Sequence, residues 1–148
     1  MRFRIATQAD LEEVARTSIS RGLKEFPVSI DHVYTLEHNG HVLGVGGIKL
    51  LTPTTAWAWF DLAAESKQYM TVVYRVIRDW LDAMIHDFDL HRVMAAVDPT
   101  FAEAVRTVEH LGFLPESRMP RFFGDNEGVL YVKFAENDHG RTPAGPNP

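Results

Sequence analysis

The stretch Val93–Ser117, VMAAVDPTFAEAVRTVEHLGFLPES, predicts a buried strand, a turn, a short helix and a glycine-terminated exit. Val93–Val97 is a short apolar run typical of a buried strand, and Asp98-Pro99 ends it. Thr100 stands where a helix cap is expected. The apolar positions of that helix recur at spacings of three and four: Phe101, Ala104, Val105, Val108 and Leu111. Gly112 supplies the positive φ that ends a helix, so the chain then returns to a sheet.

Length and composition favour a single globular domain. The chain has 148 residues, of which 45% are hydrophobic, enough to bury roughly 70% of the surface of the unfolded chain. No apolar run approaches the ~20 residues that a membrane span needs, and the opening MRFRIATQAD has no apolar signal core. We therefore expect a cytoplasmic protein without a membrane partner. The absence of cysteine excludes disulfides, thiolate metal sites and a cysteine nucleophile.

The charge balance argues against nucleic acid as a partner. The formal net charge is −5, whereas binding to phosphates needs a surplus of lysine and arginine. Arg121–Gly124 and Tyr131–Phe134 bear a faint likeness to a stacking platform for single-stranded RNA. The acidic balance and the missing motif weigh against that interpretation.

The N-terminal third predicts a strand, a helix and a hairpin. Phe3 and Ile5 alternate with arginines in a half-buried strand, and Thr7 and Asp10 match a capping box. The expected helix carries an apolar stripe and ends near Gly22; the stripe comprises Leu11, Val14, Ala15 and Ile19. Strands over Val33–Leu36 and Val42–Leu51 flank the hairpin turn Asn39-Gly40. The glycines of the second strand indicate a bulge or a close backbone approach; they are Gly44, Gly46 and Gly47.

The rest of the chain predicts a fourth strand, a long helix, a fifth strand, a short helix and a hairpin. In the fourth strand Trp57, Trp59 and Asp61 share one face. A helical stripe runs from Lys67 to Phe88, formed by Val73, Ile77, Trp80, Leu81, Met84 and Ile85. A strand over His91–Val97 precedes the short helix, and Arg121–Phe134 forms the hairpin. We expect one domain over residues 1–134 and a disordered tail over 135–148.

This order of elements, over about residues 2–134, resembles that of the GCN5-related N-acetyltransferases. The opening RIATQADLEEVA is similar to the first strand and helix of that family. The resemblance implies an α+β fold: a mixed, mostly antiparallel sheet flanked by helices, with a cleft between the fourth and fifth strands. It also implies acetyl transfer from acetyl-CoA to a small-molecule or protein amine.

The resemblance places acetyl-CoA along the fourth strand and the start of the long helix. Strand backbone would pair with the pantetheine arm, and the helix N-terminus would bind the pyrophosphate. The residues implied are Phe60, Leu62, Ala63, Lys67, Gln68, Tyr69, Met70 and Thr71. The family has small residues where this chain has Met70 and Val72, which we expect to narrow the approach to the diphosphate. Val108 replaces a tyrosine that protonates the thiolate, so catalysis needs another acid, a water, or no acid.

Asp61 is the candidate general base, because a carboxylate in an aromatic pocket has a raised pKa suited to deprotonating an amine. The alternative is an exposed aspartate at a strand end. Glu37 with His38 could face the acceptor, or lie at a solvated hairpin end, and Glu109 with His110 fits a helix C-terminus. The run His86–His91 contains imidazoles and carboxylates but spans a helix end and a strand start. Its side chains are not expected to converge, so we expect no metal site.

A second resemblance is to small acetyltransferase-like proteins of tailed bacteriophages, which also lack the glycine loop. Their tryptophan-rich fourth strand leads into a basic or amphipathic helix, as Trp57–Phe60 leads to Lys67 here. Such proteins need not be enzymes. The alternative function is thus a catalytically inactive protein-binding module, a phage virion or host-takeover protein. The resemblance to the acetyltransferases also implies a possible homodimer through the C-terminal strands.

Overall fold

The expected order of elements is confirmed in a computed structural model that describes residues 1–17 and 32–136. The N-terminal elements are β1 (Arg2–Ile5), α1 (Gln8–Thr17), β2 (His32–His38), β3 (His41–Thr52) and β4 (Thr55–Leu62). A 3-10 helix, η2 (Ala64–Tyr69), then leads into α2 (Met70–Asp87). The C-terminal elements are β5 (Arg92–Val97), α3 (Ala102–His110), β6 (Leu114–Phe123) and β7 (Asn126–Phe134). The expectations for Ile19, Gly22 and residues 137–148 lie outside the described residues.

The strands form one seven-stranded sheet in the order β1-β2-β3-β4-β5-β7-β6. Every neighbouring pair is antiparallel except β4 and β5, which are parallel. A parallel pair needs a crossover connection, and α2 is that crossover. The fold is therefore α+β with a mixed, mostly antiparallel sheet, as the sequence indicates.

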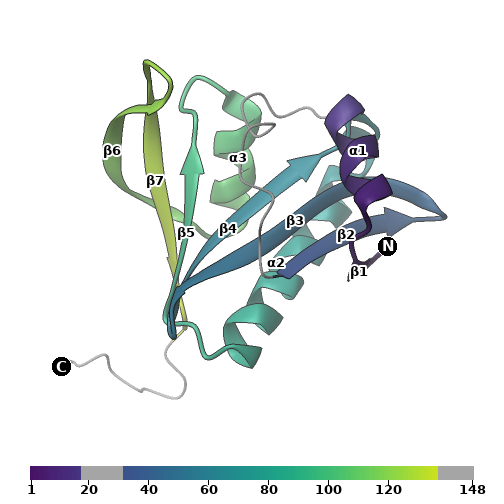
Figure 1. Ribbon diagram of the computed structural model, residues 1–148, viewed down its shortest axis with the longest axis horizontal. Helices are drawn as coiled ribbons and strands as arrows, with labels where there is room; N and C mark the ends of the chain where they lie inside the picture. Colours follow the sequence, from purple (N-terminus) through teal and green to yellow (C-terminus); the bar gives the residue numbers. More distant parts are fainter. Residues whose placement is uncertain (18–31, 137–148) are drawn as a thin grey trace.

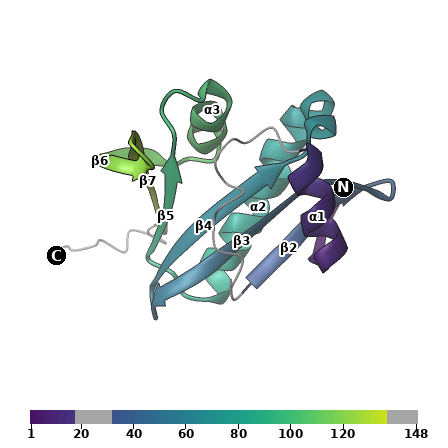
Figure 2. The ribbon, with the colours of Figure 1, turned by 45° about the horizontal axis from the view of Figure 1, so that its top comes forward.

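The helices cover both faces of the sheet. Figures 1 and 2 show α1 over one face and α2 behind the other. The larger core lies on the α2 side and takes in buried residues of the helices, the strands and the turn after α3, among them Ile77 and Leu81 of α2 and Leu111 and Phe113 of that turn. A smaller cluster lies under α1, where Val14 packs with Val45 and Trp59. Burial on two faces fixes the register of the central strands, because a slip by one residue would exchange the two sets of side chains.

Trp80 of α2 anchors the helix to three strands through ring contacts. Its ring stacks on Phe3 of β1 with 5.2 Å between centroids. It also meets Tyr34 of β2 and Phe60 of β4 edge-on, each at 5.6 Å. Aromatic pairs in this range add stability beyond their buried area, so α2 is held against the half of the sheet that ends at β4.

The glycines of β3 allow close packing against both neighbouring strands, β2 and β4. A Cβ on Gly47 would lie 2.3 Å from the carbonyl oxygen of His32, and one on Gly46 would lie 2.6 Å from the Phe60 ring. The register also shifts between Leu36 and Glu37. A bulge or a close backbone approach was the expectation, and the strand has both.

Four details differ from the sequence expectations. Ile5 is 77% exposed; it lies at the end of an edge strand that pairs only with β2. Ala15 is exposed, so α1 rests on the sheet through Leu11 and Val14. The long helix does not begin at Lys67, because the 3-10 helix precedes an α-helix that starts at Met70. Thr100 is not a cap: its hydroxyl donates to Asp98, and the helix begins one residue later than expected.

The strand β6 forms an outer edge of the sheet and is mostly exposed. It begins at Leu114, earlier than the hairpin expected from Arg121, because the chain re-enters the sheet directly after Gly112. Pro115 and Pro120 lie within it, and its register with β7 shifts twice. Arg121 has a positive φ of 60°, which further interrupts the regular strand.

Candidate functional site

The strands β4 and β5 separate after a short parallel ladder. Only Thr55–Trp57 of β4 pair with Arg92–Met94 of β5. Beyond them β4 continues to Leu62 and β5 to Val97, and the two strands diverge in both ribbon views (Figures 1 and 2). We call this unpaired region the splay; it comprises residues 58–62 of β4 and 95–97 of β5. The expected separation of the fourth and fifth strands is confirmed.

Backbone groups of β4 point into the splay at alternate positions. The amide of Ala63 donates to the Leu43 carbonyl in β3 over 2.8 Å. Since the direction of backbone polar groups alternates along a strand, those of Asp61 also face β3, whereas those of Phe60 and Leu62 face the β5 side. The Ala63 carbonyl accepts bonds from Ser66. Ala63 therefore lacks the outward-facing backbone groups that Phe60 and Leu62 have.

The side chains of β4 divide between the two faces as expected. Trp59 packs under α1, whereas Phe60 and Leu62 pack with the larger core on the α2 side. Asp61 lies on the Trp59 side by alternation and is only 7% exposed. The alternative of a solvent-exposed aspartate at the strand end is therefore wrong.

The five residues expected to bind the diphosphate lie at the junction of η2 and α2. The Lys67 ammonium is 3.2 Å from a carboxylate oxygen of Glu103, and Gln68 donates to the carbonyl of Glu65. The ring of Tyr69 meets that of His38 edge-on at 5.1 Å. Met70 packs against the core, and Thr71 is exposed.

No side chain caps the N-terminus of α2 among the described residues. The start of α2 carries the positive end of the helix dipole, and η2 continues into it without a break. The start of α2 can therefore receive an anion.

Ser66 shapes the turn that leads from β4 to this helix start. It is fully buried, and both its amide and its hydroxyl donate to the Ala63 carbonyl, over 3.0 and 2.7 Å. The sequence analysis did not single out Ser66. Its only signal was a serine shortly after an apolar strand, a common site for such local bonds.

Val108 of α3 is buried in the larger core. Its apolar side chain therefore supplies neither a proton nor a polar contact, and only its backbone carbonyl accepts a hydrogen bond. The amide of Phe113 returns to its carbonyl over 3.0 Å, and Gly112 has a φ of +91°. The expected glycine termination of this helix is confirmed.

The other candidate side chains do not converge on the splay. Glu37 pairs with Arg2 and Arg4, and the ring of His110 stacks on Tyr74 of α2. In the run His86–His91 the imidazoles lie beside neighbouring aspartates. Within the part of the chain that the structure describes, no group of three or more possible ligands could hold a metal ion.

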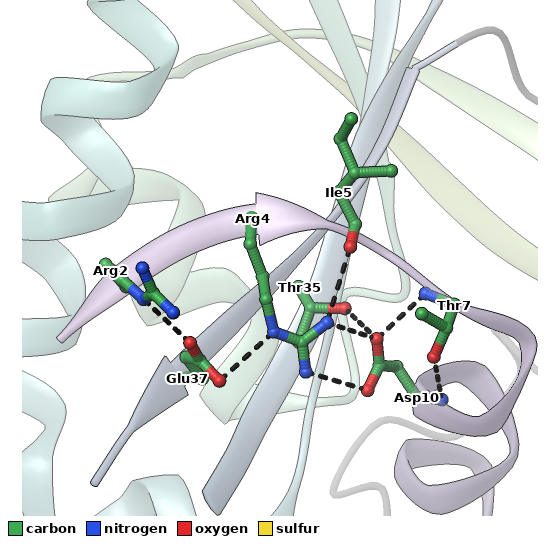
Figure 3. Close-up of polar contacts among 7 residues, drawn as sticks. All are labelled: Arg2, Arg4, Ile5, Thr7, Asp10, Thr35 and Glu37. Carbon is green, nitrogen blue, oxygen red and sulfur yellow. Dashed lines mark hydrogen bonds and ion pairs between the residues drawn. The ribbon is translucent and has the colours of Figure 1, made fainter. Parts of the chain in front are cut away.

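A polar network fastens the N-terminal strand and helix to β2 (Figure 3). Asp10 receives two bonds from the Arg4 guanidinium, of 2.7 and 3.0 Å, and one from the hydroxyl of Thr35. It also completes the capping box with Thr7, each residue accepting from the other's amide. The bonds from Arg4 hold the pKa of Asp10 well below its usual range. They likewise lower the pKa of Glu37.

No family model and no curated protein matches this chain, but solved structures do. A chimera of the spermidine N-acetyltransferase SpeG from Vibrio cholerae and hSSAT superposes with a TM-score of 0.71 at 15% identity, over 90% of this chain and 96% of that one. Ard1 from Thermoplasma volcanium gives a TM-score of 0.69 at 21% identity, over 90% and 97%. The protein smu.2055 from Streptococcus mutans UA159 gives 0.68 at 17%, over 92% and 100%.

The chain has the fold of the GCN5-related N-acetyltransferases. At these identities the likeness concerns the fold alone. In residues 1–17 and 32–136 no helix is long and apolar enough to cross a membrane.

Proposed function

We propose that this protein transfers an acetyl group from acetyl-CoA to an amine. The observation that carries the proposal is the splay, where the backbone groups of Phe60 and Leu62 point toward β5 and meet no partner strand. An extended ligand rich in amides can pair with such a strand edge as an added strand does. The pantetheine arm of acetyl-CoA is such a ligand.

The start of α2 supports the same proposal. Its uncapped N-terminus follows β4 directly through η2, so an anion there lies at the end of the strand edge. We propose that Lys67, Gln68, Tyr69, Met70 and Thr71 surround the diphosphate. The Met70 side chain packs against the core. It therefore leaves the diphosphate room to approach the backbone at this position, where the family has a small residue.

Asp61 is proposed as the base that deprotonates the amine, directly or through a water. The amine nitrogen then forms a bond to the acetyl carbonyl carbon and the bond from carbon to sulfur breaks. Water protonates the released thiolate and takes back the proton that Asp61 removed from the amine. A backbone amide near Leu62 would stabilise the charge on the carbonyl oxygen. Water is proposed as the acid because Val108 occupies the position of the family's tyrosine.

Three features support an amine as acceptor. Acetyl transfer to nitrogen needs a base within reach of the donor site, and Asp61 is a buried carboxylate on the strand next to the splay. The acidic net charge of −5 also favours a cationic partner over an anionic one. One structural neighbour with this fold is a spermidine N-acetyltransferase, an enzyme that acetylates an amine.

Calorimetric titration of acetyl-CoA into the purified protein tests the proposal. We expect saturable binding at one site with a Kd below about 100 μM, a binding free energy near −5.5 kcal/mol. ADP is the control, because it has a diphosphate but no pantetheine arm, and it should bind more weakly. The proposal fails if millimolar acetyl-CoA produces neither heat nor a thermal shift.

Asp61→Asn tests the base. With an accepted amine, we expect turnover at neutral pH to fall by roughly 100-fold, while the affinity for acetyl-CoA stays unchanged. Asp125→Asn, at an exposed hairpin position, is the control and should keep full turnover. Thermal unfolding of both variants checks that the fold is retained. Equal turnover rates for Asp61→Asn and the parent protein would exclude Asp61 as the general base.

The inactive protein-binding module is the second candidate. Two sequence features favour it: Met70 and Val72 replace small residues, and Val108 replaces the tyrosine. A protein of this kind would show no heat with acetyl-CoA, so the same titration separates the two candidates.

A further inference from the structure

We propose that Glu103 holds the Lys67 side chain in an ion pair between the segments that follow the two strands of the splay. This pair thereby limits the affinity of the α2 N-terminus for a diphosphate. This inference rests on the proposed function, since it concerns the same site. It makes Glu103 of α3 a residue that controls cofactor affinity without contacting the cofactor.

The first observation is the position of the ion pair in the fold. Lys67 belongs to η2, which follows β4, and Glu103 lies in the first turn of α3, which follows β5. Their side chains meet at 3.2 Å between nitrogen and oxygen. Because β4 and β5 are unpaired in the splay, this pair joins the elements that continue from the two separated strands.

The second observation is another side-chain contact between the same two sides. The ring of His110 in α3 stacks on that of Tyr74 in α2, with 4.5 Å between centroids and 13° between planes. Tyr74 lies seven residues after Lys67, and His110 lies seven residues after Glu103. The two contacts therefore bridge α3 to the η2–α2 segment at successive levels.

The charges around Lys67 explain how the pair would affect binding. The one acidic residue of η2, Glu65, has a carboxylate oxygen 3.6 Å from the His41 ring, and the first turn of α2 has no acidic residue. A diphosphate at the start of α2 would attract the Lys67 ammonium, and Glu103 competes for it. Both side chains are partly exposed, at 55% and 37%, so the pair is weak enough to exchange.

A double-mutant cycle with coenzyme A as the probe tests this inference. We expect Glu103→Gln to lower the Kd of coenzyme A about fivefold, and Lys67→Gln to raise it by a similar factor. In the Lys67→Gln background, adding Glu103→Gln should change the Kd less than about twofold, because the competing pair is already absent. Glu127→Gln is the control, since it removes a carboxylate that pairs with Arg118 between β6 and β7 and not with Lys67, and it should leave the Kd unchanged.

Acetyl-pantetheine, which lacks the diphosphate, provides a second readout: its binding should be the same in the parent protein and in Glu103→Gln. If the parent protein binds coenzyme A and Glu103→Gln binds it equally well, the inference is overturned and the proposed function stands. An equal gain in the Lys67→Gln background also overturns it, because Glu103 would then act by repulsion alone. If the parent protein binds neither coenzyme A nor ADP at millimolar concentration, both the inference about Glu103 and the proposed function are overturned.

Discussion

Replacing Phe113 with alanine is expected to lower the free energy of unfolding by about 4 kcal/mol, within the range for removing a buried phenylalanine. Phe113 is 1% exposed and ranks first in size among the fully buried side chains of the described residues. It also lies where α3 ends and the chain returns to the sheet, and its amide bonds to the carbonyl of Val108. A cavity here would loosen the contact of α3 with the core.

Denaturant unfolding followed by tryptophan fluorescence measures this loss. Leu114→Ala is a matched control, because the neighbouring side chain is 65% exposed; its expected cost is below about 0.5 kcal/mol. Similar losses for the two variants would contradict the placement of Phe113 in the core.

Replacing Asp10 with alanine is expected to cost about 3 kcal/mol, at the lower end of the range for breaking a buried ion pair. The change leaves the hydroxyl of Thr35 and the guanidinium of Arg4 without their shared acceptor and removes half of the capping box. Arg4 remains 31% exposed in its side chain and can regain water, which keeps the cost moderate. Denaturant unfolding at pH 7 measures it.

The pH dependence of stability provides a second test of the network. The pKa of Asp10 is lowered in the folded state by Arg4, whereas the unfolded value is about 3.9. The stabilisation is therefore present above about pH 4 and is lost as the pH falls further toward the folded pKa. We expect the parent protein to lose more stability than Asp10→Ala between about pH 5 and pH 2. Glu13→Ala, in an exposed pair with Arg16, should follow the parent protein, and parallel curves for parent and Asp10→Ala would rule out this linkage.

Local signals in the sequence were sufficient for most of the fold. The capping box at Thr7, the turn at Asn39-Gly40 and the helix end at Gly112 each depend on neighbours within a few residues, and the structure confirms all three. Helical and strand periodicity likewise located α2 and the alternation of β4. The separation of the strands followed from the resemblance to the family.

The details of the candidate site depend on partners distant in the sequence. The burial of Asp61 depends on the packing of α1 over the sheet, and the pairing of Lys67 with Glu103 depends on how two helices follow two separated strands. The hydrogen bond from the Ala63 amide to the Leu43 carbonyl depends on the register of β3. None of these contacts has a periodicity of its own, so no local pattern of residues predicts them.

The structure of β6 affects how copies of this protein can associate. An edge strand with a continuous row of amides invites a strand of another molecule to pair with it. In β6 two of the ten positions are prolines without an amide hydrogen, and the register shifts and the positive φ of Arg121 interrupt the remainder. A sheet that continues from one copy into the next through β6 is therefore disfavoured. Copies that associate at this edge would do so through side chains such as Leu114 and Phe122. Because such contacts do not extend the sheet by backbone pairing, the growth of fibrous aggregates is limited.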